Sequence, residues 1–342
     1  MHYASGEGYI MFDQNNIGHM IRPVLKCQFT TLMMFRCTKR KYAEQFQKGE
    51  IFFGAPRNWV QMELDGNIGQ GDILEGTFFS AIENDKSSFV RSMKDSDSFE
   101  YFNKNGFVFF RRKGILDLRC LCLYGLHDNS FNKTIDENGQ AHYQSRITKR
   151  YFSDFTDYKT REEYDKAEKA EQPVVVFVYN PHEFFNRIQT ALMELGVKEE
   201  EIIISPVEYL NRYEPMTTNI PYPGELLLKD KSFEKQSEVR IIINSNSPQY
   251  ISYMQRNNNI LSIGSLADIT QIYDYYFNDL SLERMGNTGL MFSLPQSKTF
   301  SIYDMSFFEL EDLLHNILRG TVKIKELKEE SCIVKVDTSK TE

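Results

Sequence analysis

Short apolar runs recur along the chain, separated by glycine, proline and charged residues. Runs of this length that are rich in β-branched and aromatic residues are typical of β-strands. The runs that predict strands lie at residues 28–35, 51–53, 77–82, 106–112, 118–124, 173–179, 201–207, 225–229, 233–244, 260–263 and 290–293. We therefore expect a strand-rich α+β protein with mixed or antiparallel sheets and peripheral helices.

Helical spacing is confined to a few segments. Residues 39–48 have apolar side chains on one helical face and stop at Gly49. Residues 181–195 follow an Asn-Pro start signal and stop at Gly196. Residues 306–318 show an amphipathic pattern that predicts one more helix.

A polar, charge-dense region separates the two halves of the strand pattern. It covers residues 128–171, and its acidic and basic residues alternate at helix-neighbour spacings over 160–171. We interpret it as a charged insertion, helical over that last part. Because we find no internal repeat and no linker elsewhere, residues 1–342 are expected to form a single composite domain.

Composition excludes several classes of protein. The formal charge of −8 gives no global electrostatic reason to bind nucleic acid or an anionic membrane, although a local basic groove is compatible with it. The five cysteines include no C-x-x-C pair, and the six histidines never fall at metal-ligand spacings, so we expect reduced thiols and no metal site. Without a leader pattern or a membrane-length apolar run, the protein is expected to be cytoplasmic, with no membrane partner.

The stretch 233–244 opens with polar residues and closes with a β-branched run. Alternate residues of a continuous strand share a face, so one side is expected to carry Glu234, Gln236, Glu238 and Arg240. A glutamine and a glutamate two residues apart form a site if a concave surface faces them. The alternative interpretation is an edge strand with one solvated polar face.

Other polar residues stand at the ends of predicted strands. Arg36 follows the first strand and precedes a short helix, a glycine and a second strand. On the strand at 77–82, Thr77 and Phe79 are expected on one face and Ser80 on the other. The segment before that strand is expected to be a solvated loop that contains Asp72 and Glu75.

Taken in chain order, Arg36, the strand at 77–82 and Gln236-Ser237-Glu238 resemble the ADP-ribosyltransferase superfamily. Its members carry an Arg or His on the first strand, a Ser/Thr or Tyr on a middle strand, and a late Glu-x-Glu or Gln-x-Glu motif. The layout is also similar to an uncharacterised bacterial family found in phage-defence neighbourhoods, with matches at Arg36, Asp72, Glu75, Gly76, Glu238 and Arg240. The resemblance spans residues 28–244 and rests on short motifs.

The resemblance implies an ADP-ribosyltransferase-like fold and NAD as the substrate. Glu238 would be the catalytic carboxylate, Gln236 would orient the acceptor, and Arg36 would bind the pyrophosphate through paired guanidinium contacts. The chemistry agrees independently. Cleavage of the nicotinamide–ribose bond passes through an oxocarbenium-like cation, which a carboxylate stabilises.

The middle strand would supply further cofactor contacts. Thr77 or Ser80 would support Glu238 or the nicotinamide ribose, and Phe79 or its neighbour Phe78 would stack on the nicotinamide. This strand reads Thr-Phe-Phe-Ser where the superfamily has Ser-Thr-Ser. Since Thr77 and Phe79 are expected on the face opposite Ser80, not all of these residues can serve the same site.

The predicted function is therefore NAD-dependent ADP-ribosyl transfer by a bacterial toxin or phage-defence effector. The acceptor would be a protein side chain or a nucleic acid, RNA included, and an antitoxin or chaperone would be a partner. One alternative is NAD hydrolysis. Another is a non-catalytic binding or sensor module that uses residues 273–277 and 306–318 as interaction surfaces. A nuclease is disfavoured because the sequence shows no metal-ligand cluster.

Overall fold

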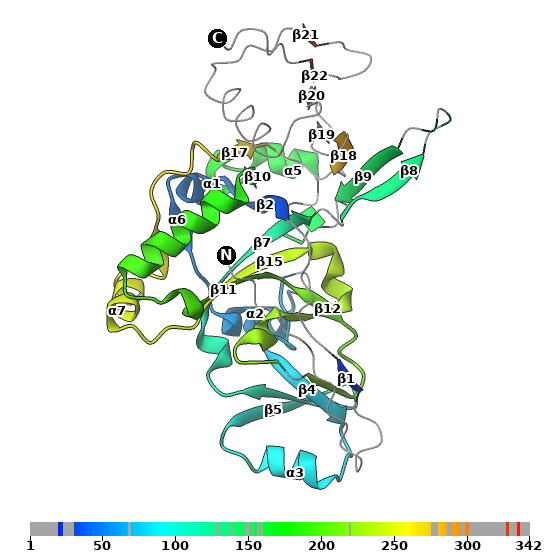
Figure 1. The fold of residues 1–342 in the computed structure, drawn as a ribbon, viewed down its shortest axis with the longest axis vertical. Helices are drawn as coiled ribbons and strands as arrows, with labels where there is room; N and C mark the ends of the chain where they lie inside the picture. The colour runs from blue at the N-terminus through cyan, green and yellow to red at the C-terminus, as the bar shows by residue number, and fades with distance from the viewer. Residues whose placement is uncertain are drawn as a thin grey trace. The chain divides into compact units, whose positions relative to one another are not determined.

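The protein is a mixed α+β structure with largely antiparallel sheets and several helices, as the strand-rich pattern predicts (Figure 1). The computed structural model describes residues 20–22, 31–67, 70–127, 130–135, 137, 139, 141–147, 151–152, 154–155, 158, 160–218, 220–274, 280–285, 289–294, 298–300, 326–327 and 334–335.

Internal contacts divide the chain into two compact units. The first unit combines Met1–Gln28, Phe52–Tyr124 and Gln189–Leu261. The second unit combines Phe29–Ile51, Gly125–Ile188 and Ser262–Glu342. Both units are thus assembled from segments far apart in the sequence, and the polar region 128–171 belongs to the second.

One sheet of the first unit has five strands, in the order β1 (Met20–Arg22), β13 (Met216–Thr218), β4 (Thr77–Ile82), β6 (Phe107–Arg112) and β5 (Phe99–Lys104). Its pairings are antiparallel except for β1 with β13. Helix α3 (Ser88–Lys94) lies against one face of this sheet (Figure 1). There, buried apolar side chains form a cluster of Phe79, Ala81, Val90, Met93, Val108 and Phe110.

The strand that begins at the glutamate of the Gln-x-Glu motif lies inside a sheet. β15 (Glu238–Ile243) pairs with β11 (Ile202–Pro206) on one side and with β7 (Arg119–His127) on the other, both antiparallel. All six residues of β15 are buried. The edge-strand interpretation is therefore wrong, because β15 has a partner on each side and no solvated face.

Short elements complete the first unit. β12 (Glu208–Leu210) and β14 (Leu228–Asp230) form a two-stranded parallel sheet. The helices and helical turns are α2 (Pro56–Leu64), η1 (Ile115–Asp117), η4 (Glu199–Glu201), η5 (Gly224–Leu227), η6 (Lys231–Gln236) and α7 (Pro248–Arg256). Neither α2 nor α3 was predicted from the sequence pattern.

The second unit contains an antiparallel set of strands, β2 (Thr31–Lys39), β10 (Pro173–Val178) and β17 (Thr270–Tyr273). A separate antiparallel sheet contains β8 (Asn132–Ile135), β9 (Ala141–Ile147), β18 (Leu280–Met285), β19 (Gly289–Leu294) and β20 (Lys298–Phe300). β21 (Glu326–Leu327) and β22 (Val334–Lys335) form a short antiparallel pair. The strands β3 (Glu50–Phe52) and β16 (Ile260–Ser262) stand where the chain passes from one unit to the other.

The predicted helices are confirmed where the structure describes them. α1 (Arg40–Gln47) follows β2, and α6 (Pro181–Glu194) follows β10, with Asn180 accepting a hydrogen bond from the backbone of Glu183. Within the polar region, α5 (Arg161–Lys166) begins at a Thr160 capping box and is followed by η3 (Lys169–Glu171). The helix predicted over 306–318 and most of the Tyr-rich stretch 273–277 lie outside the described residues.

Candidate functional site

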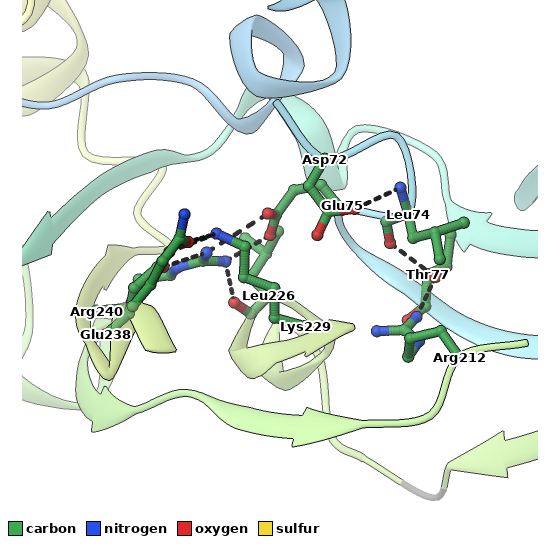
Figure 2. Close-up of polar contacts among 10 residues, drawn as sticks. Asp72, Leu74, Glu75, Thr77, Arg212, Leu226, Lys229, Glu238 and Arg240 are labelled. Atoms are coloured by element: carbon green, nitrogen blue, oxygen red, sulfur yellow. Dashed lines mark hydrogen bonds and ion pairs between the residues drawn. The ribbon is translucent and has the colours of Figure 1, made fainter. Parts of the chain in front are cut away.

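Charged side chains are concentrated in the interior of the first unit. Their exposed fractions range from 0% for Glu75, Arg212 and Arg240 to 8% for Glu238. Burying a charge is costly unless it is paired and hydrogen-bonded, so such a concentration needs a physical explanation. We define the buried polar network as six of these charged residues, Asp72, Glu75, Arg212, Lys229, Glu238 and Arg240, together with the polar residues Thr77 and Gln236 (Figure 2, which labels all but Gln236).

The chain enters β15 through a helical turn and not as a continuous strand. Asp230 accepts a hydrogen bond from the backbone N–H of Ser232 at 2.9 Å and thereby starts η6. Ser237 ends the turn in the left-handed region, with φ of 40°. The prediction that residues 233–237 alternate as a strand is therefore wrong, because the Asp230 side chain stabilises a local turn that competes with extended backbone. As a result, Glu234 is exposed whereas Gln236 is buried.

Lys229 connects Gln236 to Glu238. Its ammonium donates a 2.6 Å hydrogen bond to Oε1 of Gln236 and a short one to Oε1 of Glu238. The same ammonium lies 4.6 Å from the centroid of the Phe233 ring, where a cation–π interaction contributes further. The two residues of the predicted Gln-x-Glu motif are thus brought together by a lysine that the motif does not include.

Arg240 connects Glu238 to the segment before β4. Its Nη2 donates to Oε2 of Glu238 at 2.8 Å, and its Nη1 donates to Oε1 of Glu75 and to the backbone carbonyl of Leu226 (Figure 2). The guanidinium lies 4.9 Å from the centroid of the Trp59 ring. Arg240 is therefore the central cation of the network, with a carboxylate on either side.

Asp72 and Glu75 do not form the solvated loop that was predicted. The exposed fractions of the two side chains are 2% and 0%. The Glu75 carboxylate is paired with Arg240 in the interior, and the Asp72 carboxylate accepts a hydrogen bond from the backbone N–H of Leu74 at 2.8 Å. Gly76 follows with φ of 69°, and a Cβ there would lie 3.1 Å from Ile115. This glycine therefore allows the buried carboxylates to lead directly into β4.

Thr77 and Arg212 form the remaining part of the network. The Thr77 hydroxyl donates to the Leu74 carbonyl at 2.7 Å, and Nη2 of Arg212 donates to the Thr77 hydroxyl and carbonyl oxygens (Figure 2). Nε and Nη1 of Arg212 and Oδ2 of Asp72 are buried and have no hydrogen-bond partner among the described residues. Hydrogen-bonding capacity is thus left over at this side of the network.

The two cations give Glu238 a strongly acidic carboxyl group. Burial alone would raise its pKa, but the charges of Lys229 and Arg240 outweigh burial and lower the pKa of Glu238 to about 2. Burial raises the pKa of Asp72 and of Glu75, with the nearby cations opposing the rise. Glu238 is thus a firmly ionised carboxylate, and at 8% it is also the most exposed of the three.

The other predicted cofactor residues lie elsewhere. The Phe79 ring belongs to the apolar cluster beneath α3, and Ser80 donates to the Glu214 carbonyl at 2.7 Å. Arg36 is on β2 of the second unit, paired in register with Val176, and its role in binding pyrophosphate stays a prediction. Of the predicted residues, the network thus contains Thr77, Gln236 and Glu238.

Sequence reasoning missed Lys229 and Arg212 as network members. One signal was present, because Lys229 directly follows an apolar run of three leucines. Four of the six residues that match the phage-defence family belong to the network, namely Asp72, Glu75, Glu238 and Arg240.

Within the described ranges, no helix has the length and apolar character needed to cross a membrane. Among the same residues, no three or more His, Cys, Asp or Glu side chains are placed to hold a metal ion. Comparison of the chain with protein-family models, with curated proteins and with solved structures found no match.

Proposed function

We propose that this protein is an NAD-dependent ADP-ribosyltransferase in which Glu238 is the catalytic carboxylate. The observation that carries the proposal is the state of Glu238, which is ionised, held on both oxygens by cations and more exposed than the other two carboxylates of the network. A carboxylate fixed in this way needs little reorganisation when positive charge develops beside it.

The reaction that suits this group is cleavage of the nicotinamide–ribose bond. Positive charge builds on the ribose as the bond breaks, and a nearby carboxylate lowers the energy of that state. Each carboxylate oxygen accepts more than one hydrogen bond, so Glu238 can accept one from a ribose hydroxyl while it stays paired with Lys229 and Arg240. Gln236, which accepts a hydrogen bond from the same Lys229 ammonium, orients the acceptor nucleophile.

The acceptor is a protein side chain or a nucleic-acid base, and the biological setting is that of a cytoplasmic bacterial toxin or phage-defence effector held by an antitoxin or chaperone. These parts of the proposal rest on the resemblance of Arg36, Gln236 and Glu238 to the superfamily motifs. The acidic overall charge argues only weakly against a nucleic-acid acceptor, because a single local groove is sufficient to bind one.

The test is transfer of label from adenylate-labelled NAD to total cellular RNA, DNA and protein. We expect the wild-type protein to label one fraction, and Glu238→Gln to reduce labelling by about a hundredfold or more. Glu225→Gln is the matched control, because Glu225 is also fully buried and paired with an arginine, Arg112, outside the network. NAD loss without labelling would indicate a hydrolase instead. Equal behaviour of wild type and both variants would contradict the catalytic role of Glu238.

A non-catalytic binding or sensor module is the second candidate, and one observation favours it. The carboxylates of the network are matched by as many cations, namely Arg212, Lys229 and Arg240. Such a self-compensated group also serves to fix one packing arrangement without any chemistry. In that case Glu238→Gln would change stability or partner binding, and NAD would be neither consumed nor transferred.

A further inference from the structure

Two side chains from a small sheet meet at Glu238. Tyr209 on β12 and Lys229 on β14 are register partners in the parallel β12–β14 pair. The Tyr209 hydroxyl accepts a hydrogen bond from the backbone N–H of Glu238 at 2.8 Å, and the Lys229 ammonium donates to its carboxylate. One partner therefore contacts the main chain of Glu238 and the other contacts the end of its side chain.

We propose that Tyr209 and Lys229 form a two-point clamp that positions Glu238 for catalysis. The inference deepens the proposed function and rests on it. Tyr209 fixes the backbone of Glu238 at the start of β15, and Lys229 fixes the direction of its carboxylate. Both are positioning residues, since each acts on the reaction through Glu238.

The register of the β12–β14 pair explains how one small sheet supplies both contacts. Side chains at paired positions of neighbouring strands project to the same face, so Tyr209 and Lys229 are presented together. Each strand is only three residues long. A change of register between these strands would therefore move Tyr209 and Lys229 apart and separate the two contacts at Glu238.

The backbone N–H of Glu238 needs an acceptor outside its own turn, and the Tyr209 hydroxyl supplies it. Ser237 leaves η6 in the left-handed region, so the next N–H points away from the helical turn. That N–H donates to Tyr209, while the carbonyl of Glu238 accepts from Val207 at 2.8 Å. Loss of the Tyr209 hydroxyl would leave a buried N–H without a partner at the catalytic residue itself.

Lys229 also affects the ionisation of Glu238 through its charge, which Tyr209 does not. The titratable and charged groups that face Glu238 or act on its charge are Lys229 on β14, Tyr209 on β12, Arg240 on β15, Cys122 and Tyr124 on β7, and Glu75 beyond Arg240. The other strand paired with β15, β11, has no titratable side chain. Burial raises the pKa of Cys122 and of Tyr124 to about 12, so both are neutral near pH 7. Lys229 and Arg240 are therefore the cations that keep Glu238 ionised.

The two halves of the clamp predict different kinetic signatures. Lys229→Met removes a neighbouring cation, so the acidic limb of the pH–rate profile should move upward by roughly 1–3 pH units. Tyr209→Phe removes no charge. It should lower kcat roughly ten- to a hundredfold at every pH, with KM for NAD little changed and the acidic limb unmoved.

Matched controls exist for both variants in the first unit. Lys104→Met removes another ion-paired lysine, whose partner is Glu63. Tyr250→Phe removes a buried hydroxyl that has no hydrogen-bond partner in the part of the chain that the structure describes. Both controls should keep the wild-type profile. Lys229→Arg, which retains the positive charge, should leave the acidic limb of the pH–rate profile close to its wild-type position.

The titration of Glu238 tests the clamp without any turnover. In full-length protein carrying carboxyl-labelled glutamate, the Glu238 NMR signal is assigned by its loss in Glu238→Gln and followed from pH 8 to pH 3. We expect Glu238 to stay ionised across this range in wild type and in Lys104→Met, and to take up its proton within it in Lys229→Met. Identical titrations, together with an unmoved acidic limb, would overturn the clamp. If the wild-type protein never turns over NAD, the proposed function fails, and the titration alone then decides whether Lys229 controls Glu238.

Discussion

Two buried regions of the first unit are built on opposite principles. Beneath α3, the side chains of β4 and β6 form an apolar cluster around Phe79 and Phe110. Around the start of β15, the interior instead holds charged side chains, and Glu238 pairs there with Lys229 and Arg240. Burial of apolar area stabilises a fold at about 25 cal/mol per Å², whereas a buried ion pair is often no more stabilising than apolar residues of the same volume.

The comparison indicates which region was kept for stability and which for another reason. The apolar cluster tolerates exchange of similar side chains, because its contribution depends mainly on area and volume. The buried polar network tolerates no loss of a partner, because each removal leaves an unpaired charge. A network with this property is retained for specificity or for chemistry, which is why we assign the candidate site to it.

The largest expected effect is at the centre of the network. Arg240→Met should destabilise the protein by about 3–5 kcal/mol, since it leaves Glu75 and Glu238 buried without their shared cation. Urea denaturation followed by circular dichroism measures this loss. Met93→Ala in the apolar cluster is the comparison, with an expected loss of about 2–4 kcal/mol that does not vary with pH. The loss of stability in Arg240→Met, in contrast, should vary with pH. A loss independent of pH would contradict the contrast between the two regions.

A smaller effect is expected from acid. The pKa of Glu238 is lowered from 4.5 to about 2 in the folded protein, so its pairing stabilises the fold fully above pH 4.5. That contribution is lost as the pH falls from about 4.5 toward 2, because the unfolded chain takes up the proton first. Unfolding free energies measured across this range should fall less steeply for Glu238→Gln than for wild type. Parallel curves would show that Glu238 does not carry the predicted pairing.

The smallest effect is expected where an ion pair is exposed. Arg57 and Asp117, also in the first unit, form a pair whose side chains are 54% and 60% exposed. Solvent screens such a pair, and Asp117→Asn should change the free energy of unfolding by less than about 1 kcal/mol. A loss as large as that of Arg240→Met would mean that burial is not what distinguishes the network.

The strands β4 and β6 of the apolar region could be predicted from the sequence, but α3 could not, and the polar region could be predicted only in part. β4 and β6 were expected because their apolar runs are long enough to mark strands. Gln236 and Glu238 were singled out by their spacing, but the spacing was read on a strand that in fact begins at Glu238. The Asp230 cap decides that boundary, and a side chain that competes with an extended backbone leaves no periodic signal.

The partners of Glu238 were harder still to predict. The apolar run at 225–229 predicted a strand, but the structure has η5 over most of it and the three-residue β14 after it. The pairing of β14 with the equally short β12, which brings Lys229 to Glu238, gave no sequence signal. Asp72 and Glu75 were expected in solvent because polar residues near glycines usually form loops. Only the contacts of Arg240, which joins segments 165 residues apart, show that these carboxylates belong inside.

The left-handed conformation of Ser237 has a consequence for how distant relatives are to be recognised. Besides glycine, asparagine and aspartate are the residues that adopt this conformation most readily. A chain that shares the site need not match elsewhere, but it should carry one of these residues, or serine, immediately before the glutamate. It should also have a lysine nine residues before that glutamate and an arginine two residues after it. This short signature can be searched for where overall sequence similarity has been lost.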